Sequence, residues 1–235
     1  MLIIDGDTTA AEVRTLAQND YGQIPSRPLP ARQRVEEPPS YAARRVVLTD
    51  PTLHQASWSR SYLAPSYRRA PGREAYALAL LAQILGGGPT SRLYRHLVVE
   101  QHLATAIGAD YDFDKRDYGI FSIAASPPAG QDPTRLEAAI DVELRRLLAE
   151  GVSESELAEA KAQVAAASIK ARDGLSGPAR IIGTALATGQ SLADIEAWPD
   201  RIAAVERADV AAAAKAILAP ENSVTGLLLP AGNAP

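Results

Sequence analysis

The sequence offers few side chains for metal or thiol chemistry. It has three histidines, His54, His96 and His102, and no cysteine, which excludes disulfides and thiolate sites. His96 and His102 are six residues apart, about 120° from each other around an α-helix, so their imidazoles do not converge. His96 and Glu100 are four apart, which predicts a contact between them on one helix face. Because a zinc site needs three protein ligands, we expect no metal or other cofactor in this chain.

The sequence also gives little support for a catalytic nucleophile or for an anion-binding loop. No Gly-x-Ser-x-Gly elbow is present to expose a catalytic serine, so we predict no catalytic residue. The run GGGPTSR ends in Arg92 and puts free amides and a guanidinium near a helix start, where an anion could bind. It lacks the lysine and spacing of a phosphate-binding loop, which favours a plain turn between helices. Arg60 could contact a ligand, but an arginine lying over the aromatic side chains of its strand face, Trp58 and Tyr62, explains it better.

The helices and strand that hold these residues form one unit over residues 79–111. An apolar helix comes first, and a second, amphipathic helix and an alternating strand follow a triple glycine. The glycines are expected to end the first helix because they tolerate a positive φ. Thr90 or Ser91 is expected to cap the second helix through its hydroxyl.

Composition bounds the class of protein. A chain of 235 residues, 46% hydrophobic and 22% charged, can bury a substantial core. A net charge of −4 without a basic patch argues against nucleic-acid binding. No apolar run reaches the ~18 residues of a membrane helix. The lack of cysteine suits the cytoplasm as well as the periplasm.

Three parts are expected along the chain. Residues 1–24 predict a strand at 2–4 and a helix, with Thr9 and Glu12 as a capping box. Such a unit cannot bury its own apolar face, so it must dock elsewhere, and a chain that opens inside a strand suggests a piece of a longer protein. Residues 25–43 are rich in proline and predict an extended linker. Residues 44–235 are expected to form one domain. In the helix predicted within residues 1–24, the apolar stripe that we expect to be buried is Val13, Leu16 and Ala17.

Within 44–235 the pattern predicts an α+β fold, an antiparallel sheet with helices layered on one face. Expected strands span 44–49, 56–63, 105–111, 118–125 and 224–229. Asp132 with Pro133 begins one helix, Ser153 with Glu156 opens the next by a capping box, and Ser191 with Asp194 opens a further one. A last helix is expected at 209–218.

The run LLAQILGGGPTSRLYRHLVVEQHLATAIGADY, followed by a hairpin and GVSESELAEAKAQV, resembles the pitrilysin/insulinase-type zinc metallopeptidases. It is similar to their C-terminal, non-catalytic half. The likeness extends to ATGQSLADIEAWPDRIAAV and VTGLLLP, and IIDGDTTAAEVRTLAQNDYGQIP resembles the last strand and helix of the preceding half.

The resemblance implies a two-part protease whose N-terminal half carries a His-x-x-Glu-His zinc motif. That motif is absent here, and HLVVEQH is not a variant of it. The positions at which some members hold the substrate with Arg and Tyr fall at Val98 and Thr105, and neither residue matches. The residues expected to face substrate are Gly86, Gly87, Gly88, Arg92, Val98 and Thr105.

The main hypothesis is therefore the non-catalytic half of a zinc metalloendopeptidase, which walls a chamber and binds peptide. Zinc would be held by an N-terminal catalytic half, in the same gene product or a partner subunit, and this chain alone is expected to be inactive. The alternative is a catalytically dead scaffold subunit of the same fold, which could form a homodimer. The resemblance favours the periplasm.

Overall fold

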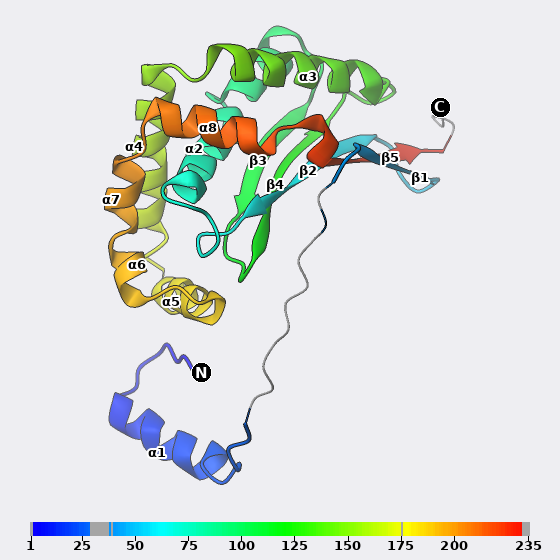
Figure 1. Ribbon diagram of the computed structural model, residues 1–235. Helices are drawn as coiled ribbons and strands as arrows, with labels where there is room; N and C mark the ends of the chain where they lie inside the picture. The colour runs from blue at the N-terminus through cyan, green and yellow to red at the C-terminus, as the bar shows by residue number, and fades with distance from the viewer. Residues whose placement is uncertain (1, 29–37, 39, 175, 232–235) are drawn as a thin grey trace.

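The computed structural model describes residues 2–28, 38, 40–174 and 176–231 (Figure 1). The first helix, α1 (Ala10–Tyr21), stands apart from the body of the protein, with no buried residue. In chain order the other elements are β1 (Arg44–Asp50), β2 (Ser57–Pro65), α2 (Glu74–Gly86), η1 (Tyr94–Glu100), β3 (Ala106–Asp112), β4 (Tyr118–Ser126), α3 (Pro133–Glu150), α4 (Glu154–Lys170), α5 (Gly177–Thr188), α6 (Leu192–Glu196), α7 (Trp198–Ala203), α8 (Arg207–Ile217), η2 (Pro220–Asn222) and β5 (Ser223–Pro230).

The strands form one sheet in the order β1-β5-β2-β4-β3. β2 lies antiparallel to β4 and to β5, and β3 lies antiparallel to β4, which is the predicted hairpin. The outer pair differs from the expectation, because β1 runs parallel to β5, with Val46 opposite Gly226. The α+β class is confirmed. The long connection from residue 51 to residue 222, which includes strands β2 to β4 and the helices, allows β1 and β5 to run in the same direction.

The core lies on one face of this sheet. Trp58 and Tyr62 of β2 are buried, whereas Ser57, Ser59 and Leu63 face the opposite, exposed side. Figure 1 shows α2, α3 and α8 together on the covered face. This period-two burial confirms the predicted alternation of the strand.

Most predicted helix boundaries are confirmed. The Asp132 carboxylate accepts from the Thr134 amide, and Gly151 ends α3 at φ +74°. Ser153 and Glu156 form the capping box of α4. Ser191 caps α6 with Asp194, but the predicted helix breaks into α6 and α7, with a proline at the start of α7. The helix α5 was not predicted.

The second helix of the central unit is a π-helix rather than an α-helix. The expected hydroxyl cap is wrong: the Ser91 hydroxyl donates to the Gly88 carbonyl at 2.6 Å, and the Thr90 hydroxyl donates to Glu159 at 2.8 Å. The helix therefore begins without a side-chain cap.

The N-terminal segment departs most from expectation. The capping box of Thr9 and Glu12 is confirmed, but residues 2–4 form no strand. Leu16, predicted to be buried, is 61% exposed. The reason is that no other described element packs against this helix, so its apolar stripe has nothing to bury it. Of the predicted linker, residues 29–37 and 39 lie outside the described part of the chain, and the division into three parts stays a prediction.

No helix in the described part of the chain is both long and apolar enough to cross a membrane.

Candidate functional site

The triple glycine joins α2 to the sheet at close range. A Cβ on Gly86 would lie 2.0 Å from the Ala109 amide nitrogen and 2.5 Å from the Gly108 carbonyl carbon. Only Gly88, at φ +147°, has the positive φ that was expected of the turn. Gly86 is therefore needed for the approach of α2 to β3, and Gly88 for the turn itself.

Polar side chains of α4 fix this turn. The Gln83 amide group donates to the Gly87 carbonyl at 3.1 Å and to Gln163 of α4 at 2.5 Å. Gln163 in turn donates to Glu159, which also accepts from Thr90. The network holds the glycine segment against the middle of α4.

Arg92 is bound within the protein. Its guanidinium makes two hydrogen bonds of 2.8 Å to Glu156 and one of 3.2 Å to the Gly151 carbonyl, and only 9% of its side chain is exposed. Burial raises the pKa of Glu156, but the hydrogen bonds from Arg92 and from Ser153 outweigh it and lower that pKa to about 2. An external anion at Arg92 would have to compete with this bidentate pair.

The π-helix changes which residues meet. His96 does not pair with Glu100; its Nδ1 lies 2.7 Å from the buried carboxylate of Glu143 on α3. Glu100 instead pairs with Arg95 at 3.8 Å, five positions earlier. This spacing follows from the i→i+5 periodicity of a π-helix, which a sequence pattern of three and four does not reveal.

The two positions aligned with substrate-holding residues lie at the far end of the same unit. Val98 is half-buried in the π-helix, and its carbonyl contacts His102. Thr105 is exposed immediately before β3, where its hydroxyl donates to the Ser126 carbonyl and accepts from Gln55. As substrate contacts, these two residues and the glycines stay predictions.

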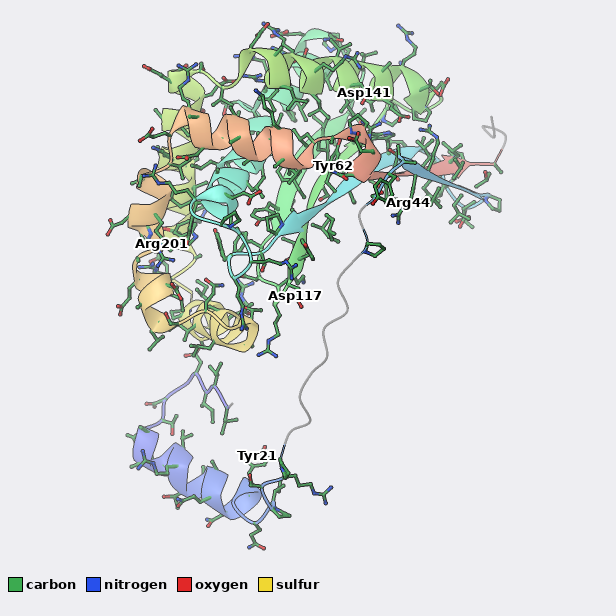
Figure 2. All side chains as sticks on the ribbon, in the orientation of Figure 1. Tyr21, Arg44, Tyr62, Asp117, Asp141 and Arg201 are labelled. Carbon is green, nitrogen blue, oxygen red and sulfur yellow. The ribbon has the colours of Figure 1, made fainter. Side chains whose placement is uncertain are left out.

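Arg60 has the expected aromatic contact and also ion pairs. Its guanidinium lies 5.1 Å from the Trp58 ring centroid. It bonds to Glu137 of α3 at 2.8 Å and also to Asp141, which Figure 2 labels on α3, and so ties β2 to α3.

No group of three His, Cys, Asp or Glu side chains that could hold a metal occurs in the described ranges of the chain. The described residues therefore do not fit a zinc site.

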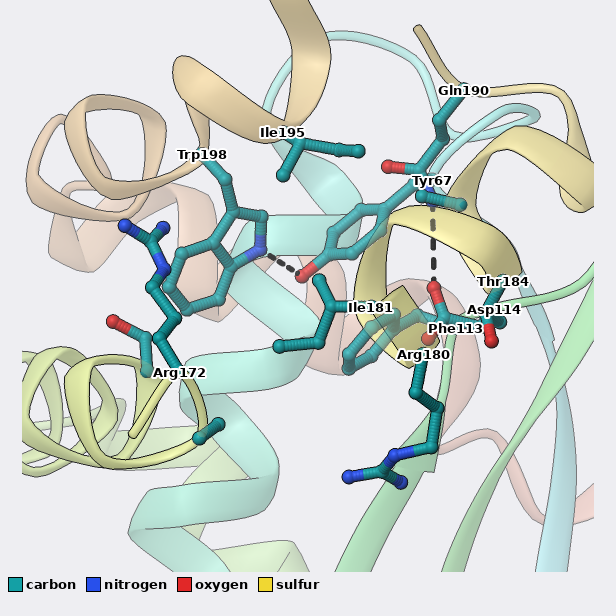
Figure 3. Close-up of a pocket in the computed structure, with 13 residues that line it drawn as sticks. Tyr67, Phe113, Asp114, Arg172, Arg180, Ile181, Thr184, Gln190, Ile195 and Trp198 are labelled. Atoms are coloured by element: carbon teal, nitrogen blue, oxygen red, sulfur yellow. Dashed lines mark hydrogen bonds between the residues drawn. The ribbon is translucent and has the colours of Figure 1, made fainter. Parts of the chain in front are cut away.

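A cavity that the sequence did not indicate lies between the ends of α4, α5 and α7 and the β3–β4 turn (Figure 3). Its volume is about 230 Å³. Trp198 Nε1 donates to the Tyr67 hydroxyl at 2.7 Å, and the Tyr67 and Phe113 rings lie 4.5 Å apart. These residues are scattered over more than 130 positions, so no local motif could have revealed them.

Comparison with known proteins decides the family. The family model described as the peptidase M16 inactive domain matches residues 1–164, more than half of the chain. This chain belongs to the peptidase M16 inactive-domain family. The predicted resemblance to the non-catalytic half of a zinc metallopeptidase is thereby confirmed.

Three relatives illustrate the match. An uncharacterized zinc protease of Rickettsia bellii is 39% identical over 90 residues, which are 38% of this chain and 21% of that protein. The structure of a protease from Helicobacter pylori is similar with a TM-score of 0.84 at 20% identity, over 96% of this chain and 54% of that one. The periplasmic protease PqqL from Escherichia coli is similar at 0.63 and 22% identity, over 96% of this chain and 24% of that one. At these identities the two structures show a shared fold, and this chain spans about half or less of each relative.

Proposed function

We propose that this M16 inactive domain is the non-catalytic half of a zinc metalloendopeptidase. It walls the substrate chamber and binds peptide, while zinc and its catalytic base reside in an N-terminal half outside this chain. The observation that carries the proposal is the bare face of the sheet, opposite the helices.

The bare face is suited to extended peptide. It carries small polar or small apolar side chains at Ser57, Ser59 and Ala124, with Leu63 and Ile120 each 47% exposed. A groove of about 470 Å³ runs over this face, lined in part by Leu63, Ile120 and Val224. Exposed apolar side chains beside small polar ones, next to a groove, suit contact with a peptide.

The surface that contacts the catalytic half would lie next to the bare face of the sheet. The edge strand β1 is exposed on both faces, with Val46 59%, Val47 41% and Leu48 61% exposed. The apolar stripe of α1 is likewise uncovered. A strand at the exposed edge of the sheet and an amphipathic helix without a packing partner are both surfaces that a second domain would cover.

The periplasm is the proposed compartment. It is supported by the fold shared with the periplasmic protease of Escherichia coli, and cytoplasmic location is the alternative.

Reconstitution tests the proposal. The catalytic half encoded with this chain, or by a neighbouring gene, is purified separately and mixed with it, and cleavage of an internally quenched peptide is measured. We expect each part alone to be inactive and the mixture to show zinc-dependent cleavage.

A matched pair of substitutions then tests the bare face. Ala124→Arg places a bulky charge on that face, and Ala138→Arg places the same side chain on the exposed side of α3. We expect Ala124→Arg to raise KM at least about tenfold and Ala138→Arg to leave KM unchanged. Equal effects would contradict a role of the bare face in binding peptide.

The scaffold alternative predicts a different result. A dead scaffold subunit would form a stable complex or homodimer, measured by light scattering, and would leave the mixture without peptidase activity.

A further inference from the structure

The cavity between α4, α5 and α7 has an apolar interior. Phe113, Ile181, Ile195 and Trp198 line it, together with the ring of Tyr67 (Figure 3). The Trp198 indole N–H donates to the Tyr67 hydroxyl, so the indole nitrogen itself is paired. The Tyr67 hydroxyl has no acceptor for its own proton among the described residues, and burial raises its pKa, which keeps that proton in place.

The described lining of the cavity carries more positively than negatively charged side chains. Arg172, just after α4, and Arg180, on α5, are exposed lining residues, and neither has an ion-pair partner among the residues described. The one described acidic residue of the lining is Asp114, which accepts from Gln190 at 3.4 Å. Burial raises the pKa of Asp114, and the described lining has two cations to this one carboxylate. The wall therefore favours an anion over a cation.

The volume limits the size of an occupant. A cavity of about 150 Å³ lined by apolar side chains is known to hold benzene. At about 230 Å³, this cavity has space for one aromatic ring or branched side chain with a short polar extension.

We propose that this cavity binds a hydrophobic carboxylate, with its apolar body against Ile181, Ile195 and Trp198 and its carboxylate on Arg172 or Arg180, whose guanidinium groups lie on opposite sides of the cavity (Figure 3). The ligand can be a free acid or the C-terminal residue of a peptide, since both present the same chemistry. Guanidinium groups are well matched to a carboxylate, because their fork of donors fits its two oxygens. The site is separate from the bare sheet face and does not depend on the proposed peptidase role.

Trp198 provides a direct readout of binding. The chain has two tryptophans, and the other, Trp58, is 1% exposed in the core. The full chain is titrated with 3-phenylpropionate and with N-acetyl-Ala-Ala-Phe, each beside its neutral amide, and heat of binding is measured in parallel. We expect a saturable change in fluorescence with a Kd on the order of 1 mM or below for the acids. The amides should bind at least about tenfold more weakly, a difference of ~1.4 kcal/mol.

A pair of double variants separates recognition from bulk charge. Arg172→Gln with Arg180→Gln removes the two cavity cations, and Arg135→Gln with Arg145→Gln removes two exposed arginines of α3. We expect about a tenfold loss of acid binding in the first and none in the second, with equal melting temperatures.

Three results would overturn the proposal: no saturable binding by either method, equal affinity for acid and amide, or equal loss in both double variants. Binding of the free acid alone supports a small-molecule ligand, and binding of the peptide supports a chain terminus.

Discussion

Gly86→Ala is the sharpest test of how the central unit is assembled. Helix propensity alone predicts that the substitution stabilises α2, because alanine is favoured over glycine by about 1 kcal/mol in a helix. The structure predicts the opposite. The new Cβ would lie 2.0 Å from the Ala109 nitrogen and 2.5 Å from the Gly108 carbon, both in the backbone of β3.

The size of the destabilisation depends on which atoms can move away from the new methyl group. Ordinary contacts of carbon atoms lie near 3.5–4.0 Å, so α2 and β3 must separate by more than about 1 Å. Neither contact is with a side chain that could rotate away, which places the cost at the upper end of overpacking, ~3 kcal/mol. After the propensity gain, we expect Gly86→Ala to destabilise the protein by about 2 kcal/mol.

Gly108→Ala is the matched control. It adds the same methyl group to the opposite side of the same contact, but its Cβ would lie 3.6 Å from the Gly86 carbonyl oxygen, an ordinary distance. We expect no loss of stability, or a gain of up to about 0.5 kcal/mol from reduced chain entropy.

Urea unfolding followed by circular dichroism measures both free energies of unfolding. The reasoning is refuted if Gly86→Ala unfolds at the wild-type midpoint, or if Gly108→Ala loses as much stability as Gly86→Ala.

Three further predictions concern charges and helix caps. The pKa of Glu156 is lowered from 4.5 to about 2 in the folded state, so its stabilisation is present above about pH 4.5 and is lost as pH falls toward 2. Urea unfolding should show a loss of at most ~3 kcal/mol over that range, and Arg92→Gln should flatten the pH dependence. Asp132→Ala should cost about 1 kcal/mol of global stability through its cap, measured in the same way. Thr9→Ala should leave the main unfolding transition unchanged, because α1 buries no residue, while NMR shows fraying of α1 alone.

Local patterns predicted those features that depend on neighbouring residues. The capping boxes at Thr9 and Ser153 are formed as expected, and Ser191 with Asp194 opens a helix as predicted, because a cap joins groups three positions apart. The buried face of β2 was likewise evident from its alternation, since one face of a strand repeats every second residue.

Features that depend on distant partners were mispredicted. Leu16 was expected to be buried, but an amphipathic stripe shows only that a helix can be covered and not whether a cover exists. His96 was expected to contact Glu100, but the π-helix turns it toward Glu143, 47 positions away.

The sequence by itself determined the family, the α+β class and the lack of a His-x-x-Glu-His motif, because these depend on residue identity, order and short spacing. Only the tertiary structure decided that Gly86 serves close packing, that Arg92 is held by Glu156, and that scattered aromatic residues enclose a cavity with two unpaired arginines among its described lining. The physical reason is that each of these depends on two or more segments far apart in the chain, and their separation is set by the packing of the whole core rather than by any local pattern.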